Sequence, residues 1–224
     1  MSAHNHNLTE PGDTHIMALR DIPDIVVGRL PVYLRALSRM AQEGQTITSS
    51  KELGERLGIS SAQIRKDLSH FGEFGKQGTG YQIEYLIEQV QRILKVNTEW
   101  EVALVGVGDL GRALAHYNGF VNRGFRISAP FDSDPAKIGT TIDELKIMDA
   151  AKMVEEIRAR GLKVAMLAVP AEKAQAVADK LVEAGIRAIL NYAPINISTP
   201  SGVRVQYIDP VIHLQRMTFY LDMK

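Results

Sequence analysis

The stretch that decides the fold of this chain is Glu101-Val-Ala-Leu-Val-Gly-Val-Gly-Asp-Leu-Gly-Arg-Ala-Leu114. It starts as an apolar strand, passes through a turn of the form Gly-x-Gly-x-x-Gly and continues as a helical run. In such a turn the first glycine permits the tight bend, the second lets the backbone approach a pyrophosphate, and the third lets the helix pack on the strand. The helix N-terminus then holds the phosphates. The pattern predicts a phosphate-binding turn made of Gly106, Val107, Gly108, Asp109, Leu110 and Gly111.

An acidic residue follows at the distance that a dinucleotide site requires. The apolar run 125–131 leads into Asp132, about 20 residues beyond the glycine turn. A carboxylate in this place accepts hydrogen bonds from both ribose hydroxyls, and its charge repels a 2′-phosphate. We therefore expect NADH and NAD⁺ as ligands rather than their 2′-phosphorylated counterparts. A glycine-rich turn that binds no ligand is the alternative, and the matching strand, helix and acid argue against it.

Strands and helices alternate through the whole C-terminal half, which predicts an α/β fold with a parallel sheet and right-handed crossovers. We expect strands at 101–106, 125–131, 163–169, 187–191 and 203–207, and helices at 109–120, 149–160, 171–184 and 210–222.

Ligands of open parallel sheets lie at the carboxyl ends of the strands. Two of the expected strands end there in proline-containing turns, which adds Val169, Pro170, Asn191, Ala193 and Pro194 to the expected nucleotide site. The last helix is apolar over more than one face, so it needs a partner surface in this chain or in another.

The N-terminal part is helical and carries two adjacent helix starts. Ser49 with Glu52, and Ser60 with Gln63, fit capping boxes, and Gly58 fits the C-terminal cap of the first short helix. Two short helices joined by a glycine-containing turn predict a helix-turn-helix. An apolar helix face precedes them, and the proline at position 31 inside it predicts a kink or a helix start near position 30.

The glycine-rich stretch 72–81 follows the second short helix, and we expect it to form a two-strand wing. The whole is then a winged helix-turn-helix. Gln63 suits an adenine edge, Arg65 or Lys66 a guanine edge or a phosphate, and Lys76 a phosphate or the minor groove. The alternative is a basic pair that merely solvates a surface helix. The expected DNA-binding residues are Ser60, Ser61, Gln63, Arg65, Lys66, Ser69 and Lys76.

Composition bounds the remaining possibilities. The chain of 224 residues has no cysteine, which excludes disulfides, zinc–thiolate sites and cysteine nucleophiles. Its 26 basic and 26 acidic residues balance, so a DNA-binding surface requires basic residues gathered on one face. No apolar run approaches membrane-spanning length and no signal peptide is evident. We expect a cytoplasmic protein with neither a membrane partner nor a metal.

These motifs, taken in order, resemble the Rex family of redox-sensing transcriptional repressors. The resemblance covers nearly everything from residue 24 to residue 222. Besides the glycine turn, it rests on Arg29-Leu-Pro-x-Tyr-Leu-Arg35, Ile64-Arg-Lys-Asp-Leu-Ser-x-Phe-Gly72, Arg112-Ala-Leu-Ala-x-Tyr117, Phe131-Asp-x-Asp-Pro-x-Lys-Ile-Gly139, Val169-Pro170 and Leu190-Asn-Tyr-Ala-Pro194.

The resemblance implies a homodimer that binds palindromic operator DNA when NADH is scarce and is released when NADH binds. NADH or NAD⁺ is then a ligand that is not turned over. It also implies a winged-helix DNA-binding domain over 20–95, a Rossmann domain that binds NAD(H) over 96–208, and a C-terminal helix over 209–224 that is swapped between subunits. Residues 1–19 are polar, rich in His and Asn and without periodicity, and we expect them to form a mobile tail.

Family positions add four residues. Lys137 lies in the motif that follows Asp132 and joins the nucleotide site. Arg35, Tyr117 and Asp209 match family residues that are linked across the dimer, with a pairing that changes with the redox state of the nucleotide. Tyr117 is also expected beside the nucleotide. The resemblance thus implies a switch in which the acid alternates between Arg35 and Tyr117.

Three other functions fit parts of this pattern. An NAD-dependent oxidoreductase needs a proton donor or a metal beside the nicotinamide, and neither His116 nor His213 falls in a strand-end loop. A CoA-binding regulatory module would use a similar glycine turn. A DNA-binding protein could also use its nucleotide-type domain for dimerisation alone. We expect a regulator and not an enzyme.

Overall fold

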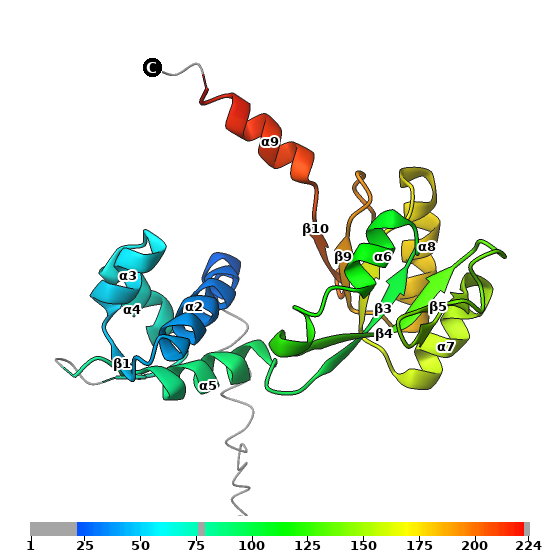
Figure 1. Cartoon of the computed structure of the whole chain (residues 1–224). Coiled ribbons are helices and arrows are strands. Elements are labelled where there is room, and N and C mark those ends of the chain that lie inside the picture. The colour runs from blue at the N-terminus through cyan, green and yellow to red at the C-terminus, as the bar shows by residue number, and fades with distance from the viewer. Residues whose placement is uncertain (1–21, 76–78, 222–224) are drawn as a thin grey trace, which may run out of the picture. The chain divides into compact units, whose positions relative to one another are not determined.

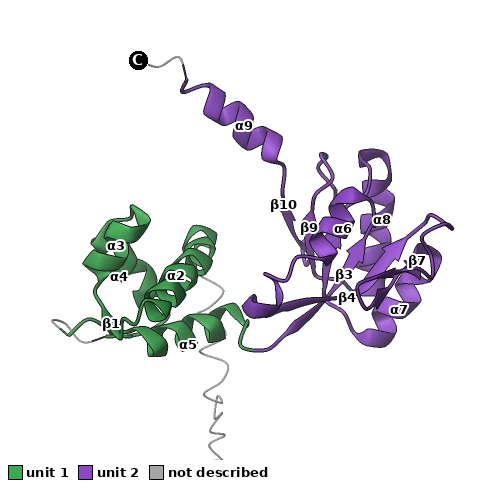
Figure 2. Ribbon diagram, in the orientation of Figure 1, with its two compact units in different colours: residues 1–97 green, residues 98–224 purple. Residues whose placement is uncertain are grey.

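A computed structural model describes residues 22–75 and 79–221. The chain divides into two compact units, residues 1–97 and residues 98–224 (Figure 2). Within the described residues, no helix has the length and apolarity needed to cross a membrane.

The first unit is built from helices and one short pair of strands (Figure 1). A core of apolar side chains, among them Leu37, Leu53 and Leu86, joins the helices. The elements are α2 (Asp24–Gln42), β1 (Ile47–Thr48), α3 (Ser50–Leu57), α4 (Ser61–Ser69), β2 (Tyr81–Gln82) and α5 (Ile83–Leu94).

Helix α2 runs through Pro31, so of the two alternatives predicted for this proline, a kink or a helix start near Leu30, the helix start is wrong. The helix begins seven residues before Pro31, at Asp24. A proline inside a helix costs about 3 kcal/mol because it removes one hydrogen bond and crowds the preceding turn. Here Pro31 is exposed, and the opposite face of α2 buries five large side chains, which offsets that cost. These are Val26, Leu30, Tyr33, Leu37 and Met40.

The strand predicted after the second short helix is present, but its partner is not the one expected. β2 pairs antiparallel with β1, which precedes α3, with Thr48 opposite Tyr81. Gly75 lies close to Gly80, the residue before β2, since a Cβ on Gly75 would lie 2.6 Å from the carbonyl oxygen of Gly80. Lys76, the expected wing cation, lies outside the described residues.

The second unit contains a six-stranded parallel sheet in the order β10-β9-β8-β3-β4-β7. If these six strands are numbered 1 to 6 in chain order and the sheet is read from β7 to β10, the order is 3-2-1-4-5-6, which is that of the Rossmann fold. The strand order reverses between β3 and β8. The strands are β3 (Trp100–Val105), β4 (Phe125–Asp132), β7 (Met148–Asp149), β8 (Val164–Leu167), β9 (Ala188–Asn191) and β10 (Arg204–Tyr207). The parallel sheet predicted from the sequence is therefore confirmed.

The other elements of this unit are α6 (Asp109–Ala115), η1 (Val121–Arg123), β5 (Thr141–Ile142), β6 (Leu145–Lys146), η2 (Ala150–Lys152), α7 (Met153–Arg160), α8 (Ala171–Ala184) and α9 (Pro210–Thr218). Three predicted helices are longer than the observed ones. α6 ends at Ala115 instead of residue 120, and the left-handed Gly124 closes the short helix η1 that follows it. η2 occupies the start expected for α7, and α9 ends at Thr218.

Helix α9 buries none of its residues within this chain. Seven large apolar side chains on it and just beyond it are exposed, in agreement with the prediction that this segment needs a partner surface. They are Val211, Ile212, Leu214, Met217, Phe219, Tyr220 and Leu221.

Candidate nucleotide-binding and DNA-binding sites

The three glycines of the turn have different physical reasons to be glycine. Gly106 has φ +93°, and a Cβ there would overlap the carbonyl oxygen of Ala168. A Cβ on Gly111 would overlap the carbonyl oxygen of Gly106, so α6 packs directly on the turn. Gly108 has φ −79° and nothing within 4 Å of a built Cβ. The fold itself thus requires Gly106 and Gly111, whereas Gly108 keeps the turn open to a ligand.

A cavity of about 310 Å³ adjoins this turn at the carboxyl ends of β3, β4 and β8. It lies at the point where the strand order reverses, which is where Rossmann sheets bind dinucleotides. Six of the residues expected from the sequence line it, namely Gly106, Gly108, Asp132, Lys137, Val169 and Pro170.

Asp132 is the buried acid of the cavity, with 8% of its surface exposed. Its Oδ2 accepts the N–H of Val107 at 2.8 Å and its Oδ1 accepts the N–H of Asp134 at 2.9 Å. Burial by itself raises the pKa of Asp132, but these two backbone donors and the Lys137 ammonium outweigh burial and hold the pKa below its usual range. The carboxylate is therefore ionised and oriented before a ligand arrives.

Lys137 partly balances that charge. Its Nζ lies 3.1 Å from Oδ2 of Asp132 and 3.8 Å from a carboxylate oxygen of Asp134. A second lysine, Lys173 in the first turn of α8, also lines the cavity, and the sequence reasoning missed it. Its place three residues after Pro170, at a strand-end turn, is the signal that could have found it. The cavity thus combines an ionised carboxylate, Asp132, with the ammonium groups of Lys137 and Lys173.

The remaining expected nucleotide residues lie outside the lining of this cavity. Val107 is buried and contributes its N–H to Asp132, while Asp109 and Leu110 are exposed on α6. Asn191 is fully buried, and its amide bonds the backbone of Ala193 and Ile195.

The loop after β9 nevertheless runs beside the cavity strands, since the N–H of Tyr192 donates to the carbonyl of Leu167 at 2.9 Å. Ala193 is buried there and Pro194 is exposed. Asn191 therefore shapes this loop through its side-chain hydrogen bonds.

The helix-turn-helix is capped as the sequence predicts, although only half of each capping box forms. Ser49 accepts the N–H of Glu52 at 3.1 Å, and Ser60 accepts the N–H of Gln63 at 3.2 Å. The side chain of Glu52 accepts from Thr48 and Gln45 instead of returning to the cap. Gly58 ends α3 in the left-handed conformation, with φ 67°.

The polar residues expected to meet DNA lie along α4. Arg65 and Lys66 are exposed, and Arg65 donates to the Ser50 hydroxyl at 3.0 Å. The hydroxyl of Ser69 donates to the carbonyl of Lys66 at 2.8 Å, and Ser61 is half-buried in the first turn. The helix thus carries two exposed cations, Arg65 and Lys66, and an exposed serine, Ser69.

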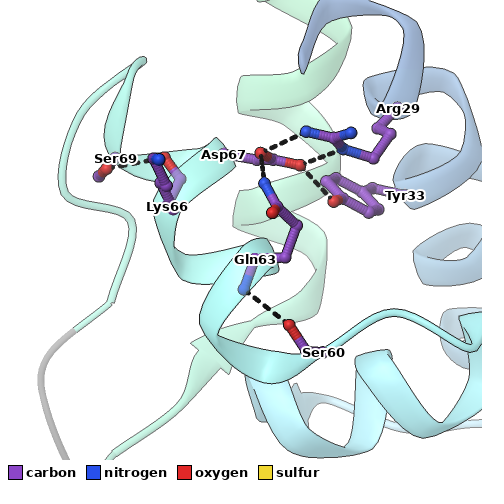
Figure 3. Close-up of polar contacts among 7 residues, drawn as sticks. All are labelled: Arg29, Tyr33, Ser60, Gln63, Lys66, Asp67 and Ser69. Atoms are coloured by element: carbon purple, nitrogen blue, oxygen red, sulfur yellow. Dashed lines mark hydrogen bonds and ion pairs between the residues drawn. The ribbon is translucent and has the colours of Figure 1, made fainter. Parts of the chain in front are cut away.

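Sequence reasoning missed the buried network that joins α4 to α2 (Figure 3). Asp67 of α4 is fully buried, and Arg29 of α2 donates to both of its oxygens, at 2.5 and 2.7 Å. Tyr33 donates to Oδ2 at 2.6 Å, and the amide of Gln63 donates to Oδ1 at 2.7 Å. All four residues lie within or beside the quoted motifs, but only their packing shows that they meet.

Of the three expected switch residues, Arg35 lies in the first unit, and Tyr117 and Asp209 lie in the second. Arg35 is exposed on α2. Tyr117 lies two residues beyond α6 and is exposed, with its ring edge-on to Phe120 at a centroid distance of 4.9 Å. Asp209 caps α9 by accepting the N–H of Val211 at 2.9 Å. Among the described residues, no cluster of three or more acidic, histidine or cysteine side chains is arranged to hold a metal ion.

The fold and the cavity define a two-domain regulator, in which a helix-turn-helix precedes a dinucleotide-type sheet. Family models agree with both halves. One described as "Putative DNA-binding protein N-terminus" matches residues 21–69, and one described as "CoA binding domain" matches residues 97–195.

Curated relatives identify the family. A redox-sensing transcriptional repressor Rex from Chloroflexus aurantiacus is 56% identical over 199 residues, which cover 89% of this chain and 94% of that protein. One from Roseiflexus is 51% identical over 203 residues, covering 91% and 92%, and one from Streptomyces coelicolor is 41% identical over 205 residues, covering 92% and 80%. The chain belongs to the Rex family of redox-sensing transcriptional repressors, a family named for repression and not for an enzymatic reaction.

Solved structures also place the chain in the Rex family. RSP, a Rex-family repressor solved in complex with β-NAD⁺ and operator DNA, superimposes with a TM-score of 0.86 at 34% identity, covering 90% of this chain and 93% of that one. RSP in complex with β-NADH gives a TM-score of 0.82 at 31% identity, covering 90% and 95%.

Proposed function

We propose that this protein is an NADH-controlled repressor that acts in the cytoplasm as a homodimer. It binds a palindromic operator when NADH is scarce and leaves the operator when NADH binds. The observation that carries this proposal is the presence, in one chain, of a capped helix-turn-helix and of a dinucleotide cavity built on Gly106, Gly108 and Asp132. The complexes of RSP with NAD⁺ and operator DNA, and with NADH, support it.

The residues of the cavity fit an adenine dinucleotide. The open space at Gly108 admits a pyrophosphate to the turn, because a Cβ there meets no other atom of the chain. Asp132, ionised and fixed, accepts hydrogen bonds from ribose hydroxyls. Lys137 and Lys173 supply positive charge around the phosphates. The adenosine half therefore occupies the cavity, and the nicotinamide half runs towards the loop that carries Asn191, Ala193 and Pro194, at the adjoining strand end.

The functional division of the chain follows from these sites. Residues 20–95 bind DNA, residues 96–208 bind NAD(H), and the helix in 209–224 is swapped between subunits. The unpartnered apolar side chains of α9 support the last assignment, because seven large exposed groups on one segment favour burial against a second chain. The DNA contacts come from Ser60, Ser61, Gln63, Arg65, Lys66, Ser69 and Lys76.

Repression and release are linked thermodynamically. NADH must bind the DNA-incompetent state more tightly than the DNA-competent one, and DNA must then weaken NADH binding by the same factor. A tenfold effect requires about 1.4 kcal/mol, which a few altered hydrogen bonds can supply. No hydride transfer is needed.

The proposal is tested by following NADH binding through energy transfer from Trp100, the single tryptophan. The full chain is titrated with NADH, alone and with a palindromic duplex selected by the same protein from random sequences. We expect the duplex to weaken NADH binding at least tenfold. Tight NADH binding that the duplex leaves unchanged would contradict the proposal and favour an enzyme or a plain nucleotide-binding module.

We also propose that Arg35, Tyr117 and Asp209 form the switch, with Asp209 exchanging between Arg35 and Tyr117 across the dimer. The exposure of Tyr117 supports this role, and so does the position of the half-buried Asp209 at the start of α9, whose apolar side chains are exposed. Asp209→Ala should keep both ligands bound but uncouple them. Unchanged release of DNA by NADH in that variant would contradict the switch.

A CoA-type ligand is the second candidate, because the model that matches residues 97–195 is described as a CoA binding domain. CoA shares the adenosine and pyrophosphate groups with NADH but adds a 3′-phosphate. Thermal-shift measurements with NADH, NAD⁺, NADPH and CoA at equal concentration separate the two, and we expect NADH to raise Tm the most.

A further inference from the structure

The hydrogen-bonding capacity of Asp67 is fully used inside the protein. A carboxylate offers about four lone-pair positions, and here Oδ2 accepts from Arg29 Nε and the Tyr33 hydroxyl, while Oδ1 accepts from the second Arg29 nitrogen and the Gln63 amide. Asp67 is also fully buried. It can therefore touch neither a base nor a phosphate, and any effect it has on DNA passes through the residues it holds.

The charge of Asp67 fixes which end of the Gln63 side chain faces inward. Burial by itself raises the pKa of Asp67, but its bonds to Arg29, Tyr33 and Gln63 outweigh burial and lower the pKa, so the carboxylate remains ionised and can only accept. The group of Gln63 that faces Oδ1 at 2.7 Å must then be the nitrogen Nε2. The carbonyl oxygen Oε1 and the second hydrogen of Nε2 are left over.

These two remaining groups form a donor–acceptor pair at the start of a recognition helix. Gln63 lies in the first turn of α4, whose cap is Ser60, and such positions reach base edges in helix-turn-helix proteins. In the major groove, adenine alone presents a donor, N6–H, beside an acceptor, N7; guanine presents two acceptors, cytosine a donor, and thymine an acceptor. The pair left free on Gln63 matches adenine on both counts.

We infer that Gln63 reads an adenine in each operator half-site, and that Asp67, anchored by Arg29 and Tyr33, is the positioning residue that fixes the Gln63 amide for this contact. The inference rests on the proposed function, because it requires α4 to enter an operator. It assigns to the buried Arg29–Asp67–Tyr33 network a role in sequence specificity beyond joining α2 to α4.

The test uses the full-length protein and a duplex selected by it from random sequences. Failure to select a palindrome, or a selected duplex that NADH does not release, contradicts the proposed function and not this inference. The selection is then repeated with Gln63→Ala, which keeps a good helix-forming residue in place. We expect the preference for adenine to vanish at one position of each half-site and to persist at all others.

Modified bases sharpen this result. Replacing the adenine by purine removes the N6 amino group, and replacing it by 7-deazaadenine removes the N7 acceptor. We expect each base change to weaken the affinity of the wild-type protein for the duplex by up to about 5- to 150-fold, the range for a bidentate base contact. The affinity of the Gln63→Ala variant should be the same for the modified and unmodified duplexes. A variant that keeps every base preference, or loses one at a cytosine, overturns the assignment to adenine.

The positioning role is tested with Asp67→Asn and Tyr33→Phe, with folding followed by circular dichroism and binding to non-specific DNA measured in parallel. We expect both variants to lose discrimination at the same base pair as Gln63→Ala, Asp67→Asn the more strongly, with non-specific binding unchanged. A purely structural network would lower all binding together and leave the discrimination intact, which overturns the inference. If Asp67→Asn fails to fold, the decision falls to Tyr33→Phe, which loses a single hydroxyl.

Discussion

Two buried aspartates, one in each unit, show how the same side chain serves different purposes. Asp67 on α4 is fully buried and receives all its hydrogen bonds from side chains, those of Arg29, Tyr33 and Gln63. Asp132 at the end of β4 receives two from the backbone and one from a lysine, and it lines a cavity. Asp67 is saturated by the protein, whereas Asp132 keeps a side open to solvent.

The difference teaches how a buried charge is to be interpreted. Both carboxylates have a lowered pKa, so a perturbed pKa alone does not separate a ligand-binding acid from an internal anchor. What distinguishes the two aspartates is the hydrogen-bonding capacity that remains on each carboxylate. A carboxylate with unfilled lone pairs beside a cavity can accept from ribose hydroxyls, and one with four internal donors can only hold its neighbours.

The largest expected effect is on stability, at Asp67. Asp67→Ala leaves the Arg29 side chain, itself 22% exposed, without its partner, and breaking such a buried pair costs about 3–5 kcal/mol. Urea unfolding at pH 7 measures it. The matched control is Asp132→Ala. Asp132 has mostly backbone partners and lies beside a cavity, so its loss should lower the free energy of unfolding by less. Equal losses in the two variants would contradict the contrast drawn between them.

The next effect is on NADH affinity, at Asp132. Hydrogen bonds to a charged group contribute about 1.5–3 kcal/mol each, so Asp132→Ala should weaken NADH binding by at least about tenfold. Energy transfer from Trp100 provides the measurement. Asp67→Asn is the matched control, and it should leave NADH affinity in the absence of DNA unchanged. NADPH should lose less than NADH in Asp132→Ala, because the charge that repels a 2′-phosphate is gone.

Glycine substitutions sharpen the contrast between fold and site within the cavity. Gly108→Val should abolish NADH binding while Tm stays within a few degrees, because a Cβ there meets no other atom of the chain. Gly111→Ala should lower Tm strongly, because its Cβ would overlap the carbonyl oxygen of Gly106. Thermal melts with and without NADH distinguish the two. A large drop in the Tm of Gly108→Val without ligand would show that this glycine also serves the fold.

Acid should remove the stabilisation that both aspartates provide. The folded pKa of each lies below the unfolded value of about 3.9, so their contribution is present above that value and is lost as pH falls through the folded pKa. We expect Tm to fall below about pH 4, with a shallower fall in Asp67→Asn. The same acid dependence in wild type and variant would show that Asp67 contributes nothing to it.

The smallest effect is expected at an exposed ion pair. Arg92 and Glu88 lie one turn apart on α5 with both side chains more than half exposed. Arg92→Ala should cost only about 0.3–0.5 kcal/mol, since solvent and salt screen such pairs. Comparing the loss of unfolding free energy in Arg92→Ala with that in Asp67→Ala shows how much more the buried network contributes than an exposed ion pair. A cost above about 1 kcal/mol would mean that exposure is a poor guide in this unit.

The sequence by itself determined the features that depend on local conformation. The glycine turn, Asp132 at the end of its strand, and the serine caps of α3 and α4 are set by backbone geometry within a few residues, and the structure has each where it was predicted. The alternation of elements was enough to predict the parallel sheet, because apolar periodicity and strand spacing allow few other arrangements.

Only the tertiary structure decided which side chains meet. Arg29 and Asp67 are 38 residues apart, and the sequence does not indicate that packing of α2 against α4 brings them within hydrogen-bonding distance. The sequence also does not indicate that the Asn191 amide bonds its own loop, or that the placement of α8 brings Lys173 to the cavity. Local patterns fix backbone, but a side chain's partner depends on segments far away in the chain, and only packing brings them together.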